Sequence, residues 1–194
     1  MSDQNDVLLR EWREQLSATL GRATGLADGL SDAQFNWRPG PSRWSLAQCL
    51  DHLNKVGGLL LPGIEAALRA EKDAGPAPGG APPPPWRPSL LERWFIHAVS
   101  PASRFKAPVP RVYVPVDQGA VDEIVPAFVA THERLIACMS EAEGRDLRRL
   151  QVISPASRAV RLSLGAWFAA LTAHAEYHVE QAQAVKQAPD FPRA

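Results

Sequence analysis

The sequence predicts an all-α fold, a four-helix bundle in which a long proline-rich loop and a short extra helix join the second and third long helices. Four long segments place apolar residues at alternating spacings of three and four, which is the period of a helix that buries one face. No segment shows a convincing strand pattern. The connection over about 74–117 is long enough to cross the bundle, so up-down and crossover topologies both remain open.

The composition is that of one globular domain over residues 1–194, with 45% hydrophobic and 22% charged residues. The 21 basic and 21 acidic side chains balance, and the arginines are scattered, so the charge pattern of a nucleic-acid-binding protein is missing. No segment resembles a membrane span or a signal peptide. The two cysteines have no disulfide-framework spacing. We therefore expect a cytoplasmic protein without nucleic-acid or membrane partners.

The first part of the chain predicts two long helices with a short one between them. Residues 5–26 carry apolar side chains at helical spacing among charged residues. Ser31 precedes a short turn of helix through Phe35. Ser45 is a good N-cap for the second long helix, whose apolar stripe continues past Pro62, where a kink or an interruption is expected.

The rest of the chain predicts a loop, a short helix and two more long helices. Residues 75–88 are rich in proline and glycine, so we expect a solvated, partly polyproline-like loop, with a short helix over 90–99 after it. Asp117 is expected to cap the third long helix. Residues 151–158 are expected to be irregular, and Ser163 is expected to cap the last helix.

The last helix carries the strongest functional signal, the segment LTAHAEYHVEQAQAV over residues 171–185. His174 and His178 are four residues apart and therefore leave one face of the helix on adjacent turns. They belong to a seam that should face the core, which consists of Leu164, Trp167, Leu171, His174, His178, Gln181 and Val185. Polar side chains in such positions cost stability unless something satisfies them, and a shared cation is one way to do so.

His52, at the edge of the apolar stripe of the second long helix, supplies a third imidazole. Three neutral imidazoles around a divalent ion leave one or more positions for water or substrate, which is typical of a catalytic site. The set suits zinc, nickel, iron or copper. The alternative is that these are ordinary core or surface histidines, because pairs with this spacing also arise by chance.

Other side chains could line or support this site, although no catalytic residue can be assigned. Gln181 continues the histidine face and could bond a ligated imidazole, or only pack between helices. His132, on the inward seam of the third long helix, is a candidate fourth ligand or base, or a histidine bonded to a backbone carbonyl. Tyr177 could donate a proton or simply pack, and Cys49 could be a thiolate ligand or a small apolar residue. Ala175 stands where a zincin requires glutamate, which disfavours a metalloprotease.

Two segments resemble a known family. LSDAQFNWRPGPSRWSLAQCLDHLNKVG contains the pair WS, followed by Gln48, Leu50 and the His-Leu pair that begins at His52. HAEYHVEQ contains two histidines four apart, followed by Gln181. They resemble the second-helix and last-helix signatures of the DinB-like superfamily, and the resemblance spans most of the chain in order.

The resemblance implies a four-helix bundle, frequently a homodimer, that binds a divalent ion such as zinc or nickel through His52, His174 and His178. Family members include transferases that use low-molecular-weight thiols, a maleylpyruvate isomerase and proteins classed as metal-dependent hydrolases. The implied function is thus a metal-dependent enzyme that activates a thiol or water for attack on a small-molecule substrate. Tyr177 replaces a histidine that many relatives carry, and residues 75–88 are an unusual insertion, so no single substrate is transferred.

Two other hypotheses remain open. The chain could be a noncatalytic helical bundle that binds a small ligand or a partner, with a structural metal or none. Alternatively, the proline-rich residues 75–88 could dock a proline-recognition domain, although a simple connector is the plainer interpretation.

Overall fold

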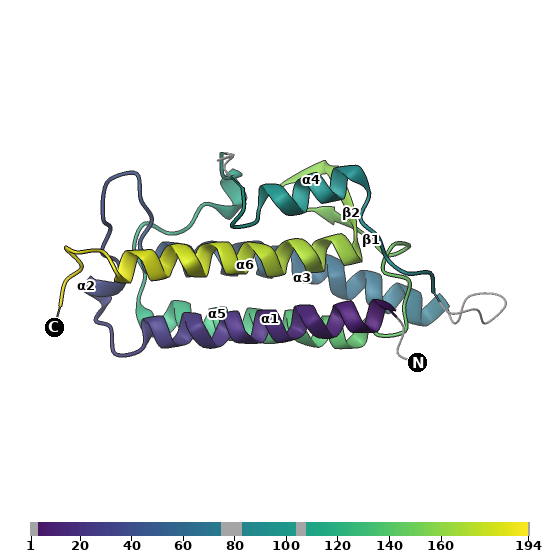
Figure 1. Cartoon of the computed structure of the whole chain (residues 1–194), viewed down its shortest axis with the longest axis horizontal. Coiled ribbons are helices and arrows are strands. Elements are labelled where there is room, and N and C mark those ends of the chain that lie inside the picture. Colours follow the sequence, from purple (N-terminus) through teal and green to yellow (C-terminus); the bar gives the residue numbers. More distant parts are fainter. Residues whose placement is uncertain (1–3, 75–82, 104–107, 194) are drawn as a thin grey trace.

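The computed structural model describes residues 4–74, 83–103 and 108–193 and confirms the all-α bundle (Figure 1). Four long helices form it, and they are α1 (Gln4–Ala27), α3 (Leu46–Ala74), α5 (Val121–Glu141) and α6 (Leu164–Lys186). Two short helices, one 3-10 turn and two strands complete the described part, namely α2 (Asp32–Phe35), α4 (Leu90–Ala98), η1 (Arg111–Tyr113), β1 (Gln151–Ser154) and β2 (Ser157–Ser163).

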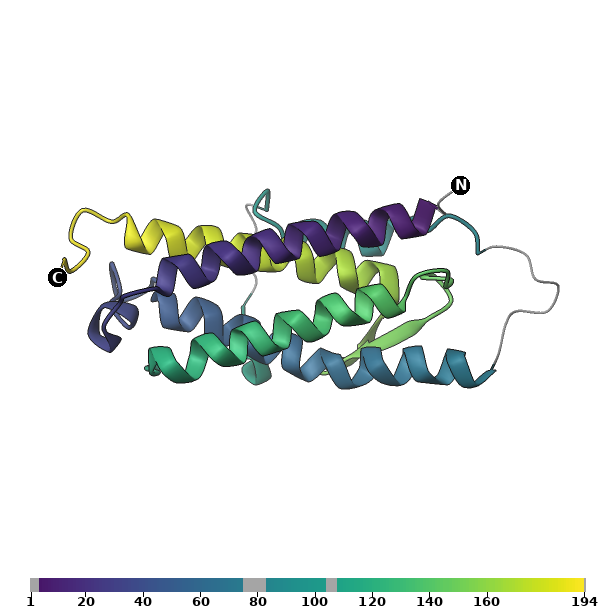
Figure 2. The same cartoon turned by 90° about the horizontal axis from the view of Figure 1, so that it is seen from below.

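The bundle has a crossover topology. Each of α1 and α3 packs against both α5 and α6, so α1 and α3 occupy diagonal corners. α1 runs parallel to α6, and α3 runs parallel to α5, as Figures 1 and 2 show. The connection from α3 to α5 therefore returns along the length of the bundle, and it carries α4 and η1 on the way.

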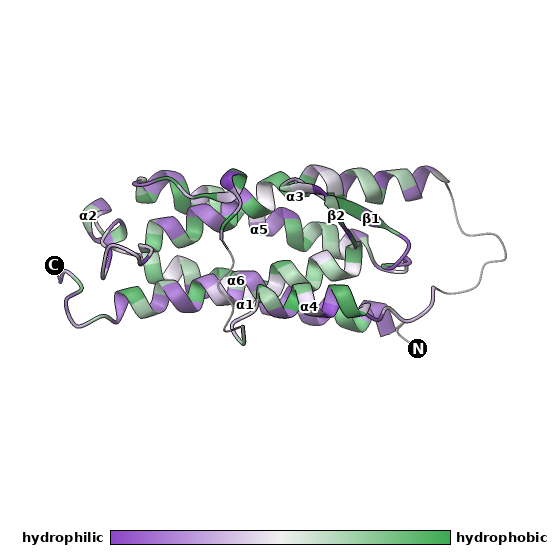
Figure 3. Cartoon of the chain, turned by 90° about the horizontal axis from the view of Figure 1, so that it is seen from above, coloured by the Kyte–Doolittle hydropathy of each residue, from purple (hydrophilic) through white to green (hydrophobic). Residues whose placement is uncertain are grey.

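The core lies between the four long helices. Hydrophobic and hydrophilic residues alternate along each of them, as the sequence periodicity requires (Figure 3). The largest fully buried side chains include Phe35, Phe128, Phe168, Leu9, Leu16, Leu50, Leu60 and Leu135. Within the described residues, no helix combines the length and the apolar character that crossing a bilayer requires.

Local side-chain bonds explain where the helices begin. The Ser45 N–H donates to Gln48 Oε1 and the Gln48 N–H donates to Ser45 Oγ, both at 3.1 Å, which is a reciprocal cap at the start of α3. Ser163 Oγ accepts the Ala166 N–H at the start of α6. Both predicted caps are therefore present.

Asp117 does not cap α5, contrary to the prediction. The helix begins at Val121, too far along the chain for Asp117 to reach its first turn. The Val121 N–H instead donates to Asp32 Oδ1 of α2 at 2.9 Å. A carboxylate distant in sequence thus replaces the local cap.

Residues 151–158 are not irregular but belong to a β-hairpin. β1 and β2 pair antiparallel, with Val152 opposite Leu162, and both of these side chains are buried. Ile153, the next residue of β1, is exposed to solvent. A four-residue strand is too short to show this alternation clearly in the sequence, which explains the missed prediction.

Trp86 anchors the described end of the proline-rich loop, residues 83–88, although Pro84, Pro85 and Arg87 are exposed, as expected of a solvated loop. Trp86 is buried, with its ring edge-on to Trp12 at a centroid distance of 5.5 Å. Its indole N–H donates to Ser163 Oγ at 3.1 Å, and its backbone N–H donates to Asn5 Oδ1 at 2.7 Å. The large apolar area of the indole outweighs the polar character of the segment around it. Residues 75–82, and with them the docking hypothesis, lie outside the described residues.

The contact between Gly165 and Trp86 generates a stability prediction. A Cβ atom at Gly165 would lie 2.6 Å from two atoms of the Trp86 indole, so Gly165→Ala forces the ring to move. We expect a loss of about 1–3 kcal/mol in the free energy of unfolding, measured by urea denaturation. Gly21→Ala is the control, because a Cβ atom there meets nothing within 4 Å, and it should stabilise the protein by about 0.5–1 kcal/mol. Equal effects of the two substitutions would contradict the packing described.

Candidate metal centre

Three histidines meet between α3 and α6. His52 of α3 faces His174 and His178 of α6, and one ring nitrogen of each lies within 4.8 Å of those of the other two. The Nε2 atoms of His52 and His174 are 3.0 Å apart. His52 and His178 are buried and His174 is half-buried, so the cluster lies at the edge of the core with one side toward solvent.

Contacts on the opposite side of α6 fix its rotation. Glu176 is two residues beyond His174, about 200° round the helix, and therefore faces away from the cluster. Its carboxylate accepts a hydrogen bond from Thr19 Oγ1 at 2.9 Å and forms an ion pair with Arg22, both on α1. Because Glu176 is held against α1, the histidine face of α6 is held against α3.

Each imidazole has its Nδ1 atom beside an oxygen acceptor. His52 Nδ1 lies 2.7 Å from the backbone carbonyl of Tyr113, and His178 Nδ1 lies 3.0 Å from Gln181 Oε1. His174 Nδ1 makes a longer contact, 3.4 Å, with the carbonyl of Val99. An oxygen acceptor requires the proton on Nδ1, and the lone pair then lies on Nε2. The three Nε2 atoms are thus the free acceptors of the cluster.

The three rings are uncharged at neutral pH. Burial lowers the pKa of His52, and it lowers the pKa of His174 to about 3, with the neighbouring charge of His52 as a further cause. Burial, followed by the charges of His174 and His52, lowers the pKa of His178 well below its ordinary value. Neutral imidazoles are the form that binds metal ions.

The donor set fits a divalent metal ion. Two lone pairs 3.0 Å apart repel one another unless a proton or a cation lies between them. Two nitrogens that each lie about 2.0–2.1 Å from one ion are about 3.0–3.4 Å apart, which is close to the separation found. Oxygen acceptors on the distal nitrogens are also the usual support of metal-binding histidines. His52, His174 and His178 could therefore hold a metal ion.

Gln181 connects the cluster to Cys49. Its Oε1 atom accepts from His178 Nδ1 and also lies 3.7 Å from Cys49 Sγ. Cys49 is fully buried, and burial raises the pKa of its thiol far above the ordinary value. The thiol is therefore protonated at neutral pH and acts as a donor to Gln181, which does not support a thiolate ligand.

Two half-buried aromatic rings pack against the cluster. Trp44 stacks on His178 with a centroid distance of 5.3 Å and an interplanar angle of 21°, and it also contacts His52 at 4.9 Å. Tyr177 lies edge-on to His178 at 4.8 Å. This contact agrees with the packing role, and a proton-donating role of Tyr177 stays a prediction.

His132 lies outside the group of three. It is buried in α5, where its Nδ1 atom donates to the carbonyl of Phe128 at 2.8 Å and its ring lies 3.9 Å from the Phe128 ring. This is the backbone-bonded alternative rather than a fourth ligand. Burial lowers the pKa of His132 to about 4.

Sequence reasoning missed three neighbours of the cluster. One is Trp44, whose position just before the Ser45 cap could have placed it beside the first turns of α3. The other two, Tyr113 and Val99, act through backbone carbonyls. Backbone groups are present at every position, so no residue type could have identified them.

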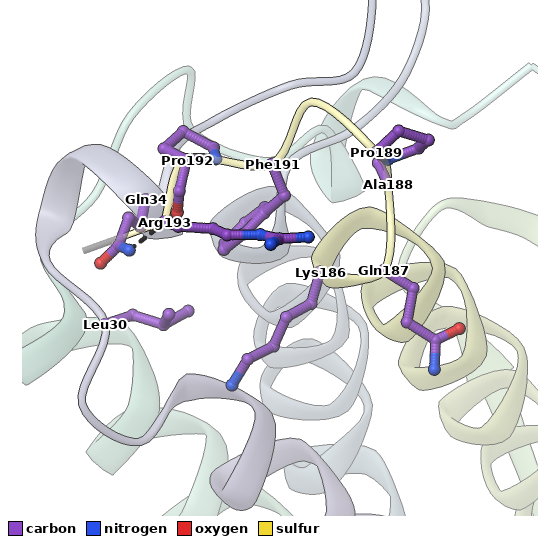
Figure 4. Close-up of a pocket in the computed structure, with 9 residues that line it drawn as sticks. All are labelled: Leu30, Gln34, Lys186, Gln187, Ala188, Pro189, Phe191, Pro192 and Arg193. Carbon is purple, nitrogen blue, oxygen red and sulfur yellow. Dashed lines mark hydrogen bonds between the residues drawn. The ribbon is translucent and has the colours of Figure 1, made fainter.

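A separate pocket lies where the C-terminal segment folds back toward α2 (Figure 4). Gln34 Nε2 donates to the Pro192 carbonyl at 2.9 Å and holds this segment in place. Lys186 also lines the pocket, but its amino group donates to the Leu26 carbonyl at 2.7 Å. None of the three clustered histidines lines this pocket, so it is distinct from the candidate metal centre.

Comparison with known proteins agrees with the resemblance seen in the sequence. A family model described as the DinB superfamily matches residues 15–182, which is most of the chain. The chain therefore belongs to the DinB superfamily. A search of curated proteins returned no match.

The buried, uncharged state of His132 generates a prediction of pH-dependent stability. The unfolded chain binds a proton near pH 6.5, whereas the folded chain binds it only near pH 4. The contribution of the uncharged His132 to the free energy of unfolding is therefore fully present above about pH 6.5. It is lost as the pH falls toward 4, by up to about 3 kcal/mol. His132→Gln, which keeps a donor for the Phe128 carbonyl, should flatten the pH dependence of unfolding measured in urea between pH 4.5 and 7.5. Identical profiles for variant and wild type would contradict the prediction.

Proposed function

We propose that this DinB-superfamily protein binds one divalent metal ion, zinc or nickel, through the Nε2 atoms of His52, His174 and His178, and uses it to activate a thiol or water nucleophile. The observation that carries the proposal is the orientation of the three rings. Each Nδ1 lies beside an oxygen, the Nε2 atoms of His52 and His174 are 3.0 Å apart, and one ring nitrogen of His178 lies within 4.8 Å of those of the other two histidines. Hydrogen bonding alone does not explain why three acceptors converge.

The protein's own groups prepare this site for an anionic fourth ligand. The three imidazoles are neutral, and the group of side chains close enough to bind contains no carboxylate. Asp51, next to His52 in sequence, accepts the Val116 N–H at 2.7 Å and forms an ion pair with Lys55 at 3.2 Å. A bound divalent ion would therefore keep its full charge, which favours a thiolate or hydroxide beside it. Such an ion lowers the pKa of a bound thiol or water toward neutrality.

The half-buried position of His174 supports catalysis more than a purely structural role. A structural site is closed by four protein ligands, whereas three ligands leave room for an exogenous one. Because His174 is partly exposed, we expect a small thiol or water to reach the Nε2 atoms from its side of the cluster.

We also propose a homodimer, as the family resemblance implies. α4 presents three exposed apolar side chains in its first five residues, and their exposed fractions are 81% for Leu90, 65% for Leu91 and 61% for Trp94. Apolar side chains grouped in this way are common at protein interfaces. A second copy of the chain could cover this face of α4.

Metal content tests the ligand assignment. The double variant His174→Ala/His178→Ala should lose the metal, from about one ion per chain in the wild type to a trace, because a single imidazole remains. Elemental analysis of protein purified without a histidine tag provides the measurement. His97→Ala is the matched control, since His97 is an exposed histidine of α4 outside the cluster, and it should keep the full content. Unchanged metal in the double variant would refute the assignment.

Activity of the metal-loaded protein tests the catalytic part. The protein should accelerate conjugation of a small thiol to an aryl halide, or hydrolysis of an activated ester, and the rate should disappear on chelation and return when the ion is restored. The double histidine variant should show only the uncatalysed rate, whereas His97→Ala should retain the full rate. A metal-loaded protein that is stably folded but inactive in both assays would instead favour the noncatalytic hypothesis.

A further inference from the structure

Trp44 contacts two of the three imidazoles of the candidate metal centre, yet it belongs to no helix. It lies in the loop between α2 and α3, one residue before the Ser45 cap. Its indole stacks on His178 and contacts His52, with centroid distances of 5.3 and 4.9 Å. A single side chain thus touches one imidazole on each of the two helices that form the cluster.

The loop that carries Trp44 is closed by internal hydrogen bonds. Arg38 donates through Nε to the Arg43 carbonyl at 2.8 Å, and through its guanidinium to the Pro41 carbonyl. The Arg43 N–H donates in turn to the Gly40 carbonyl at 3.1 Å. On the far side of Trp44, the reciprocal cap between Ser45 and Gln48 fixes the start of α3. The indole is therefore held from both sides along the chain.

Exposure places the indole on the solvent side of the cluster. Trp44 and His174 are each half-buried, whereas His52 and His178 are buried. An ion that leaves the three Nε2 atoms must pass beside these partly exposed groups. Release of the ion also requires His178 and His52 to rotate out of the coordinating orientation. The stacked indole opposes that rotation.

We propose that Trp44 is a positioning residue that holds His52 and His178 in their metal-binding orientation and slows the exchange of the bound ion. This inference rests on the function proposed above. The Nδ1 bonds to Tyr113 and Gln181 fix which nitrogen faces inward, and the indole restricts rotation of the rings about that direction. The role requires a broad planar side chain and no hydrogen bond from the indole, so phenylalanine should largely replace it.

The test is the rate at which zinc-loaded protein transfers its ion to an excess of a chromogenic chelator. Trp44→Ala should release zinc about 10-fold faster than the wild type, with one ion per chain still bound at the start. Trp44→Phe should remain close to the wild-type rate. Arg38→Gln, which loosens the loop but keeps every aromatic ring, should give an intermediate rate. Trp94→Ala is the matched control, because Trp94 is an exposed tryptophan of α4 and is not among the rings that contact His52 or His178, and its release rate should be unchanged.

A metal-free measurement adds a second criterion. In the apoprotein, the indole should shift the carbon-bound ring protons of His178 upfield in the NMR spectrum, relative to Trp44→Ala, because the two rings are stacked. If Trp44→Ala does not fold, the same shift is read against the resonances of histidine in an unfolded peptide, and the release rate is read from Arg38→Gln.

Two results separate this inference from the function on which it rests. A wild-type protein that binds zinc, with Trp44→Ala releasing it at the wild-type rate, would overturn the role of Trp44 alone. A wild-type protein that takes up no zinc would overturn both proposals. Release from Arg38→Gln at the wild-type rate, with no ring-proton shift in His178, would also overturn the role of Trp44.

Discussion

The close approach of three uncharged imidazoles is the constraint on which the rest of this structure depends. Two Nε2 atoms 3.0 Å apart need a proton or a cation between them, and they can share a cation only if each ring is neutral and held by its other nitrogen. Burial keeps the rings neutral, and the oxygens of Tyr113, Val99 and Gln181 hold them. The surrounding elements can be understood as the means by which these conditions are met.

The crossover connection contributes more than a path from α3 to α5. Val99 follows directly after α4, and Tyr113 ends η1, so this one connection provides two of the three oxygen acceptors at the cluster. An up-down bundle with short loops would bring no chain across the outside of α3 and α6 at that level. Topology and the candidate site are therefore linked, because the returning segment positions the imidazoles that the helices bring together.

Sequence reasoning recovered what depends on local pattern. Helical period located the four long helices, and cap chemistry located Ser45 and Ser163. The seam of the last helix identified His174 and His178, and the edge of the second long helix identified His52. Sequence reasoning failed where a distant partner decides the outcome. Asp32 caps α5 from a separate helix, Trp86 is buried against Trp12, and the β-hairpin is defined by pairing between very short strands. Backbone acceptors at Tyr113 and Val99 carry no side-chain signature at all.

The separation of the clustered residues along the chain has a consequence for biosynthesis. His52 lies 61 residues before Tyr113 and 122 residues before His174. A nascent chain that has completed α3 and α5 still presents only one of the three imidazoles, since both others are on the last helix. Under the proposed function, metal capture at full affinity must then follow the docking of α6 against α3. Partly synthesised or truncated chains would compete poorly for the ion in the cell.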